Sequence, residues 1–242
     1  MRIEHHQWFS PRLGRELGLT VFGHFGPPVV AFPTSGGNEW EYKDRGLIDA
    51  IGDFLDAGRV KVFAVSANHD DSFHNAFAHP FHRSYAQRRY AEYVREEVVP
   101  FVWDDCRSPL PLTAFGASMG GYHAANFVFK HPDVFRRCFA FSGVYDLRAF
   151  MDGQYNDDFY FNNPVDYLAN LNDAAVLDQL KGCDIRLVTG SGPWEDSSTS
   201  YRVNALLTAK GLTPCVDDWG PEGGHDWPYW NRQIREYVGR LG

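Results

Sequence analysis

Short apolar stretches alternate with longer amphipathic stretches along most of this 242-residue chain. Stretches with apolar side chains at helical spacing predict helices at 84–106, 119–132, 198–211 and 227–241. Runs rich in Val, Phe and Leu, bounded by Gly, Pro or Asn, predict strands at 19–26, 27–37, 59–67, 110–116, 135–143, 183–192 and 213–220. Because strands that alternate with helices form right-handed crossovers, we expect an α/β fold with a mostly parallel central sheet flanked by helices. The earliest strands are expected to be antiparallel at one edge.

The alternation breaks at residues 144–181, a segment rich in Tyr, Asn and Asp. Long irregular insertions in a compact domain are usually functional or disordered, and the many aromatic residues here favour an ordered cap. The chain contains no internal repeat, low-complexity tract or linker. Its length lies near the upper end of the single-domain range, so we expect one domain over residues 1–242.

Composition narrows the classes of partner. A formal net charge of −8 argues against binding to nucleic acid, which requires clustered Lys and Arg to neutralise phosphates. The first ten residues lack an apolar core, and no later stretch is long enough to cross a bilayer, so we expect a cytoplasmic protein without a membrane partner. Four widely spaced cysteines without a C-x-x-C pair are interpreted as free thiols.

The sequence Gly116-Ala117-Ser118-Met119-Gly120 lies between a predicted strand and a predicted helix. In a nucleophile elbow, small flanking residues permit a strained turn that exposes a serine hydroxyl above the carboxyl edge of the sheet. A glycine-rich turn in which serine merely fits is the alternative. The position between strand and helix favours Ser118 as a nucleophile.

Serine needs a base and an orienting acid, which follow in the chain order Ser, Asp or Glu, His. A loop after the strand at 183–192 carries Glu195 and Asp196, and a glycine-rich loop after the last strand carries His225. We favour Glu195 as the acid, because Asp196 precedes a helix whose N-terminus it is expected to cap. Asp196 remains the alternative acid.

Backbone amides would stabilise the oxyanion of the tetrahedral intermediate. The first amide of the helix after the elbow, that of Met119, is one expected donor. The second donor is expected from Ser35 or Gly36, in the loop after the strand at 27–37, because small residues let the backbone approach a carbonyl oxygen. A plain glycine turn is the alternative for this loop.

A histidine-rich segment at 68–83 allows a different interpretation. His69, Asp70, His74, His79 and His82 could form a metal site. Their spacing is irregular, and a loop beside the presumed active face is more consistent with substrate contact or internal hydrogen bonds. We therefore expect no metal and no cofactor.

These segments resemble the putative-esterase family of α/β-hydrolases, which includes esterase D (S-formylglutathione hydrolase), feruloyl esterases, enterochelin esterases and mycolyltransferases. The segment "GASMGGYHAANFVFKHPDVF" is similar to the family's G-x-S-M-G-G-x-x-A elbow, and "EGGHDWPYWNRQI" is similar to its histidine segment. The segment "GSGPWED" looks like the acid loop of members that use glutamate, whereas other members use aspartate. The resemblance implies the α/β-hydrolase fold and hydrolysis of acyl esters, without naming the ester.

We therefore expect a serine carboxylesterase that acts on a small or medium acyl ester through Ser118, His225 and Glu195. Two alternatives stay open, an acyltransferase that uses the same residues and a non-catalytic binding protein with a hydrolase fold. Aromatic residues of the insertion and the two loops would wall the substrate pocket or simply pack the cap: Tyr145, Tyr155, Phe159, Tyr160, Trp194 and Trp227. The oligomeric state leaves no trace in the sequence.

Overall fold

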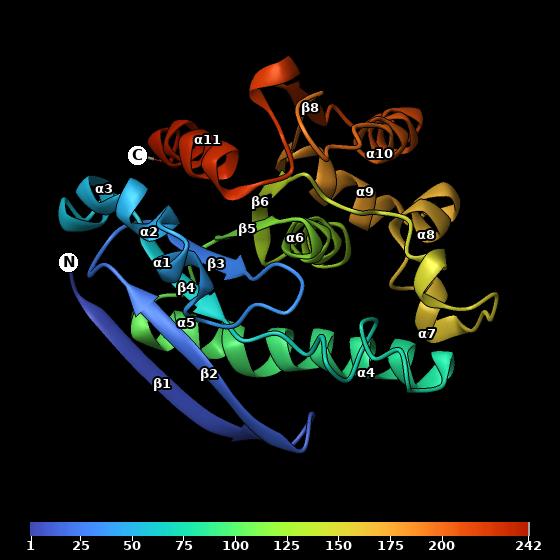
Figure 1. Ribbon diagram of the computed structural model, residues 1–242, viewed down its shortest axis with the longest axis horizontal. Helices are drawn as coiled ribbons and strands as arrows, with labels where there is room; N and C mark the ends of the chain where they lie inside the picture. Colours follow the sequence, from blue (N-terminus) through green and yellow to red (C-terminus); the bar gives the residue numbers. More distant parts are fainter. Residues whose placement is uncertain (242) are drawn as a thin grey trace.

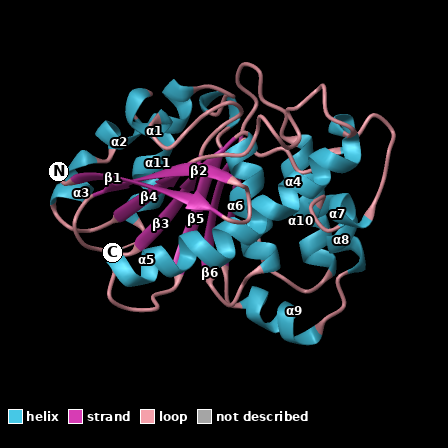
Figure 2. Cartoon of the chain, turned by 90° about the horizontal axis from the view of Figure 1, so that it is seen from below, coloured by secondary structure: helices cyan, strands magenta, loops and turns pink. Residues whose placement is uncertain are grey.

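The computed structural model describes residues 1–241, and within this range it contains one eight-stranded sheet in the order β1-β2-β4-β3-β5-β6-β7-β8 (Figures 1 and 2). β2 pairs antiparallel with β1 and β4, and all other pairs are parallel. The expected antiparallel edge and mostly parallel centre are confirmed. The strands are β1 Ile3–Ser10, β2 Arg15–Phe22, β3 Pro28–Phe32, β4 Lys61–Val65, β5 Leu112–Ala117, β6 Phe135–Phe141, β7 Asp184–Thr189 and β8 Cys215–Asp218.

Helices cover both faces of the sheet (Figure 1). One face packs against α4, α5, α6, α8 and α10, and the other against α1, α2, α3 and α11. Burial on both faces explains why β3, β4 and β5 are continuously apolar or buried rather than alternating. The helices are α1 Glu41–Asp44, α2 Leu47–Ala50, α3 Gly52–Asp56, α4 Pro80–Tyr93, α5 Val99–Asp105, α6 Met119–Lys130, α7 Asp157–Tyr160, α8 Pro164–Asn170, α9 Ala174–Lys181, α10 Ser198–Ala209 and α11 Trp227–Gly239.

The short helices α1, α2 and α3 were not predicted, and two further elements differ from the sequence predictions. β1 was not predicted, because it is an edge strand in which exposed and half-buried residues alternate, so it has no apolar run. The helix predicted at 84–106 begins earlier, at Pro80, and contains a π-helical turn at Val94–Val98 before Pro100. Pro100 lacks an amide hydrogen and its ring clashes with a carbonyl one turn earlier, so the wider turn lets the chain continue as α5.

The aromatic-rich segment between β6 and β7 is ordered as short helices. A 3₁₀ turn at Arg148–Phe150 precedes α7, α8 and α9. Leu147, Met151 and Phe159 form a small apolar cluster with Met119 and Tyr122 of α6. The segment is therefore packed directly against the helix that follows Ser118.

The junction of β5 and α6 is packed backbone against backbone. A Cβ atom on Gly116 would lie 2.2 Å from the carbonyl carbon of Gly120, and one on Gly120 would lie 2.1 Å from the carbonyl oxygen of Phe32. A Cβ on Gly121 would lie 2.8 Å from the carbonyl oxygen of Phe141. Only glycine fits at these positions, so the first turn of α6 is wedged between the ends of β3 and β6.

Replacement of Gly120 tests this packing. We expect Gly120→Ala to lower the free energy of unfolding by about 3 kcal/mol, because a methyl group must displace a strand carbonyl. The matched control is Gly52→Ala, whose Cβ meets no atom within 4 Å and which should change stability by less than about 0.5 kcal/mol. Denaturant unfolding measures both, and equal midpoints for Gly120→Ala and the wild type would show that the junction tolerates a side chain.

Candidate active site

Ser118 occupies the sharp turn between β5 and α6. Its backbone has φ 56° and ψ −119°, a left-handed conformation that L-residues rarely adopt. Its amide donates to the carbonyl oxygen of Phe141 at 2.9 Å, and its own carbonyl accepts from the amide of Tyr122 at 3.1 Å. The turn is thus held by β6 on one side and α6 on the other, and its side chain is only half-buried. Strain of this kind persists where surrounding structure enforces it, often at functional sites.

His225 approaches Ser118 from the loop after β8. Its Nε2 lies 2.9 Å from the hydroxyl oxygen of Ser118. Its backbone amide donates to the carbonyl oxygen of Pro193 at 2.9 Å, and its ring packs edge-on against Trp230 at the start of α11. The imidazole is therefore held in place by the backbone hydrogen bond of His225 and by its contact with the Trp230 ring. Its Nε2 lies within hydrogen-bonding distance of Ser118.

Glycines join the acid loop to the histidine loop. The amides of Ser191 and Gly192 donate to the carbonyls of Gly220 and Gly223, at 2.7 and 2.8 Å. A Cβ on Gly190 would lie 2.2 Å from the carbonyl oxygen of Gly223. Because no side chain separates the two backbones, the loops that follow β7 and β8 are packed directly against each other.

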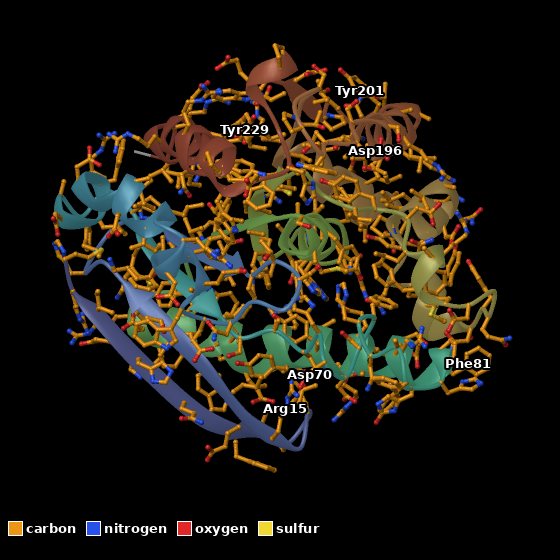
Figure 3. All side chains as sticks on the ribbon, in the orientation of Figure 1. Arg15, Asp70, Phe81, Asp196, Tyr201 and Tyr229 are labelled. Carbon is orange, nitrogen blue, oxygen red and sulfur yellow. The ribbon has the colours of Figure 1, made fainter. Side chains whose placement is uncertain are left out.

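The structure separates the roles of the two candidate acids. Glu195 Oε2 lies 3.7 Å from His225 Nδ1, and the Glu195 side chain is 1% exposed. Its Oε1 accepts from the hydroxyl of Thr189 at 2.8 Å, whereas Oε2 has no hydrogen-bond partner among residues 1–241. Asp196 is exposed beside α10 (Figure 3) and accepts from the amide of Ser198 at 3.0 Å. Asp196 thus bonds the first amide of α10 from one residue before the N-cap, Ser197, and Glu195 faces the imidazole.

A buried tyrosine connects the loop after β3 to the elbow. The Tyr42 hydroxyl donates to the carbonyl oxygen of Phe32 at 2.6 Å and accepts from the amide of Ala117 at 3.2 Å. Both Thr34 donors, the amide and the hydroxyl, are used by Glu41, at 2.8 and 2.6 Å. The Thr34 amide is therefore engaged away from the site, and Ser35 and Gly36 follow it at the exposed tip of the loop. Gly36 has φ 75°, which favours glycine.

The histidine-rich segment divides among separate structural contacts. His79 accepts from the amide of Phe81 at the start of α4, His82 lies 2.6 Å from a carboxylate oxygen of Asp71, and Asp70 pairs with Arg15 (Figure 3). Within residues 1–241, no group of three or more His, Cys, Asp or Glu side chains is arranged to hold a metal ion.

Two imidazoles of this segment, His69 and His74, lie beside the loop after β3 together with His123 of α6. His74 Nε2 is 3.1 Å from the Ser35 hydroxyl, and the ring of His69 packs against those of His74 and His123 at 5.5 and 5.7 Å. Burial lowers the pKa of His69 to about 4, and desolvation lowers the pKa values of His74 and His123 as well. The three rings are therefore neutral near pH 7, and His74 contacts the loop predicted to hold the oxyanion.

The predicted pocket aromatics fall into two groups. Tyr145 and Phe159 are fully buried in apolar clusters, so they do not line an open cavity in this structure, and the pocket prediction is corrected for them. Trp194 is 89% exposed directly before Glu195, and Tyr155 is 51% exposed with its hydroxyl donating to Asp166. Tyr160 and Trp227 are half-buried. For these four residues contact with a substrate stays a prediction.

Three residues near the site escaped the sequence analysis. Thr189 binds the Glu195 carboxylate, Tyr42 joins β3 to β5, and Gly223 lets the two loops meet. Thr189 lies within the strand predicted at 183–192, and in the structure it is the last residue of β7, before the loop that carries Glu195. Tyr42 lies in a helix of four residues, too short for helical periodicity to reveal.

A family model described as "Putative esterase" matches residues 31–241. Among solved structures, a ferulic acid esterase superposes with a TM-score of 0.76 at 17% identity, covering 100% of this chain and 99% of that one. The S-formylglutathione hydrolase of Staphylococcus aureus gives 0.63 at 18%, covering 100% and 99%, and the MPT51 protein (FbpC1) of Mycobacterium tuberculosis gives 0.72 at 14%, covering 100% and 98%. None of the curated protein sequences matches significantly.

Because their identities are low, the structural matches establish the fold alone. The family model covers most of the chain and therefore shows the family. Among residues 1–241 no helix combines the length and apolar character required to traverse a bilayer. The chain belongs to the putative esterase family and has the α/β-hydrolase fold.

Proposed function

We propose that the protein is a carboxylesterase in which Ser118, His225 and Glu195 form the catalytic triad. The observation that carries the proposal is the 2.9 Å contact between His225 Nε2 and the Ser118 hydroxyl at a strained strand-to-helix turn. A serine hydroxyl becomes nucleophilic when a base within hydrogen-bonding distance takes its proton. If His225 only packed against Ser118, the rare left-handed backbone of the serine would have no function.

Glu195 is proposed to orient His225 and to stabilise the imidazolium. A nearly inaccessible carboxylate with one unpartnered oxygen is costly unless a positive charge forms beside it. The proton that Nε2 takes from Ser118 would turn His225 into an imidazolium, whose Nδ1–H faces Glu195. The 3.7 Å separation is longer than a hydrogen bond, and catalytic contacts of this kind often tighten when substrate binds.

The reaction would proceed through an acyl-enzyme. Ser118 Oγ attacks the ester carbonyl while His225 Nε2 takes the hydroxyl proton, and the tetrahedral oxyanion accepts from the amides of Met119 and of Ser35 or Gly36. His225 then gives the proton to the leaving alcohol as the carbonyl re-forms. A water molecule attacks the acyl-enzyme with His225 again as base, which releases the carboxylic acid and regenerates Ser118.

The substrate is proposed to be a small or medium acyl ester, with Trp194 and Trp227 beside the catalytic residues. Trp194 has φ 65° and is almost entirely exposed next to Glu195, an unusual state for a large apolar ring. Trp227 lies two residues after His225 and packs against Tyr42 and Trp230. Each ring could contact an apolar part of the ester as it enters.

The first test is hydrolysis of p-nitrophenyl acetate and butyrate. We expect the wild type to cleave both esters and Ser118→Ala to lose at least about 10³-fold in kcat/KM, because the nucleophile is absent. Thermal unfolding of both proteins serves as the folding control. A folded wild type that cleaves neither ester would contradict the proposal, and so would a Ser118→Ala variant that retains activity.

The second test compares the two adjacent acids. Glu195→Gln keeps an oxygen acceptor for Thr189 but removes the charge that stabilises the imidazolium, so kcat should fall about 10²- to 10⁴-fold with little change in stability. Asp196→Ala removes the acceptor of the first amide of α10, so it should cost about 1 kcal/mol of stability and leave kcat within about threefold of the wild type. Steady-state kinetics on p-nitrophenyl butyrate, paired with thermal unfolding, separates these outcomes. The reverse pattern would assign the acid to Asp196.

A further inference from the structure

A cavity of about 380 Å³ lies at the opposite end of the strands from Ser118. Its wall is formed by the residue before β1, the turn between β2 and β3, the first residue of β4, and the end of α5 with the segment that follows it. Figure 2 shows the N-terminus and α5 at one end of the sheet and α7 and α8 at the other. Through the registers of β3 with β4 and β5, Lys61 lies level with Leu112. Ser118 is six residues beyond that level, or roughly 20 Å along the strands.

The cavity wall carries an excess of positive charge. Arg2, Lys61 and Arg107 contribute three cations, and Asp105 contributes one carboxylate, although the whole chain has a net charge of −8. The side chain of Lys61 is 4% exposed and pairs with Asp105, which satisfies a charge at the start of a central strand. Arg2 pairs with Glu4. After these two ion pairs are counted, the remaining unpaired charge in the wall is that of Arg107.

Arg107 occupies a position that normally takes glycine. The amide of Ser108 bonds the carbonyl of Trp103, and the amide of Arg107 bonds that of Asp104, both at 3.0 Å, which defines a Schellman motif at the end of α5. Arg107 is the residue after the helix cap and has φ 53°. A basic residue one turn earlier would complement the helix dipole equally well without a left-handed backbone.

The side chain of Arg107 is not committed within the fold. Among residues 1–241, its guanidinium makes neither an ion pair nor a hydrogen bond by the usual distance criteria. Next to it the wall is apolar and open, with Phe25 72% exposed and Leu110 37% exposed. An uncommitted guanidinium beside exposed apolar side chains is suited to a ligand that has both a charged and an apolar end.

We propose that this cavity binds a small organic anion, a carboxylate or phosphate monoester joined to an apolar group. The guanidinium of Arg107 binds the anionic oxygens, and Phe25 and Leu110 contact the apolar part. Lys61 and Asp105 remain paired and add no net charge. The site is separate from Ser118, so its occupancy does not depend on ester hydrolysis.

Calorimetric titration of the full chain with benzoate, phenyl phosphate and the neutral benzyl alcohol tests this site. The informative variant is Arg107→Gly, which removes the cation and also relieves the positive φ, so its thermal stability should equal or exceed that of the wild type. We expect at least one of the two anions to bind the wild type and to bind Arg107→Gly about tenfold more weakly. Lys181→Ala, which removes an exposed cation of α9, should bind like the wild type.

The pattern across the probes identifies the ligand chemistry. Binding of benzoate alone assigns a carboxylate, binding of phenyl phosphate alone assigns a phosphate monoester, and binding of both assigns any oxyanion of this size. The proposal is overturned if neither anion binds at millimolar concentration, if benzyl alcohol binds as tightly as the anions, or if Arg107→Gly binds within twofold of the wild type.

Discussion

The contact of α6 with the ends of β3 and β6 is the constraint on which the site depends. Gly120 lies against the carbonyl of Phe32, and Gly121 lies against that of Phe141, with no room for a side chain at either position. This close approach fixes where α6 begins and therefore forces Ser118 into its left-handed turn. The strain at Ser118 is balanced by packing that spans three adjacent strands, which lie at the centre of the sheet.

The strand order also sets the distance that the histidine loop must span. β5 and β8 are separated by β6 and β7, so their ends are about 14 Å apart at the usual strand spacing. The loop after β8 therefore has to fold back across the carboxyl edge before His225 can reach Ser118. Hydrogen bonds to the loop after β7, including that from His225 to Pro193, hold it there. The same contacts bring Glu195 to the other side of the imidazole.

Much of this arrangement could be predicted from the sequence, because the parallel strands, the elbow and the histidine loop each have a local signature. A local argument also favours Glu195 over Asp196 as the proposed acid, since a carboxylate just before a helix can bond its first amides, and Asp196 bonds the amide of Ser198. Properties that depend on packing between distant segments could not be predicted from the sequence. Tyr145 and Phe159 look like pocket residues in sequence, but tertiary packing buries them completely.

The edge strand β1 and the contact of His74 with Ser35 escaped prediction for the same reason. Neither has a local signature, because one depends on pairing with β2 and the other joins segments about forty residues apart.

The measurement that tests the central claim most directly is peptide mapping by mass spectrometry after treatment with a serine-directed fluorophosphonate. The account predicts one phosphonyl adduct, on Ser118. An unlabelled protein, or an adduct on a different residue, would contradict it.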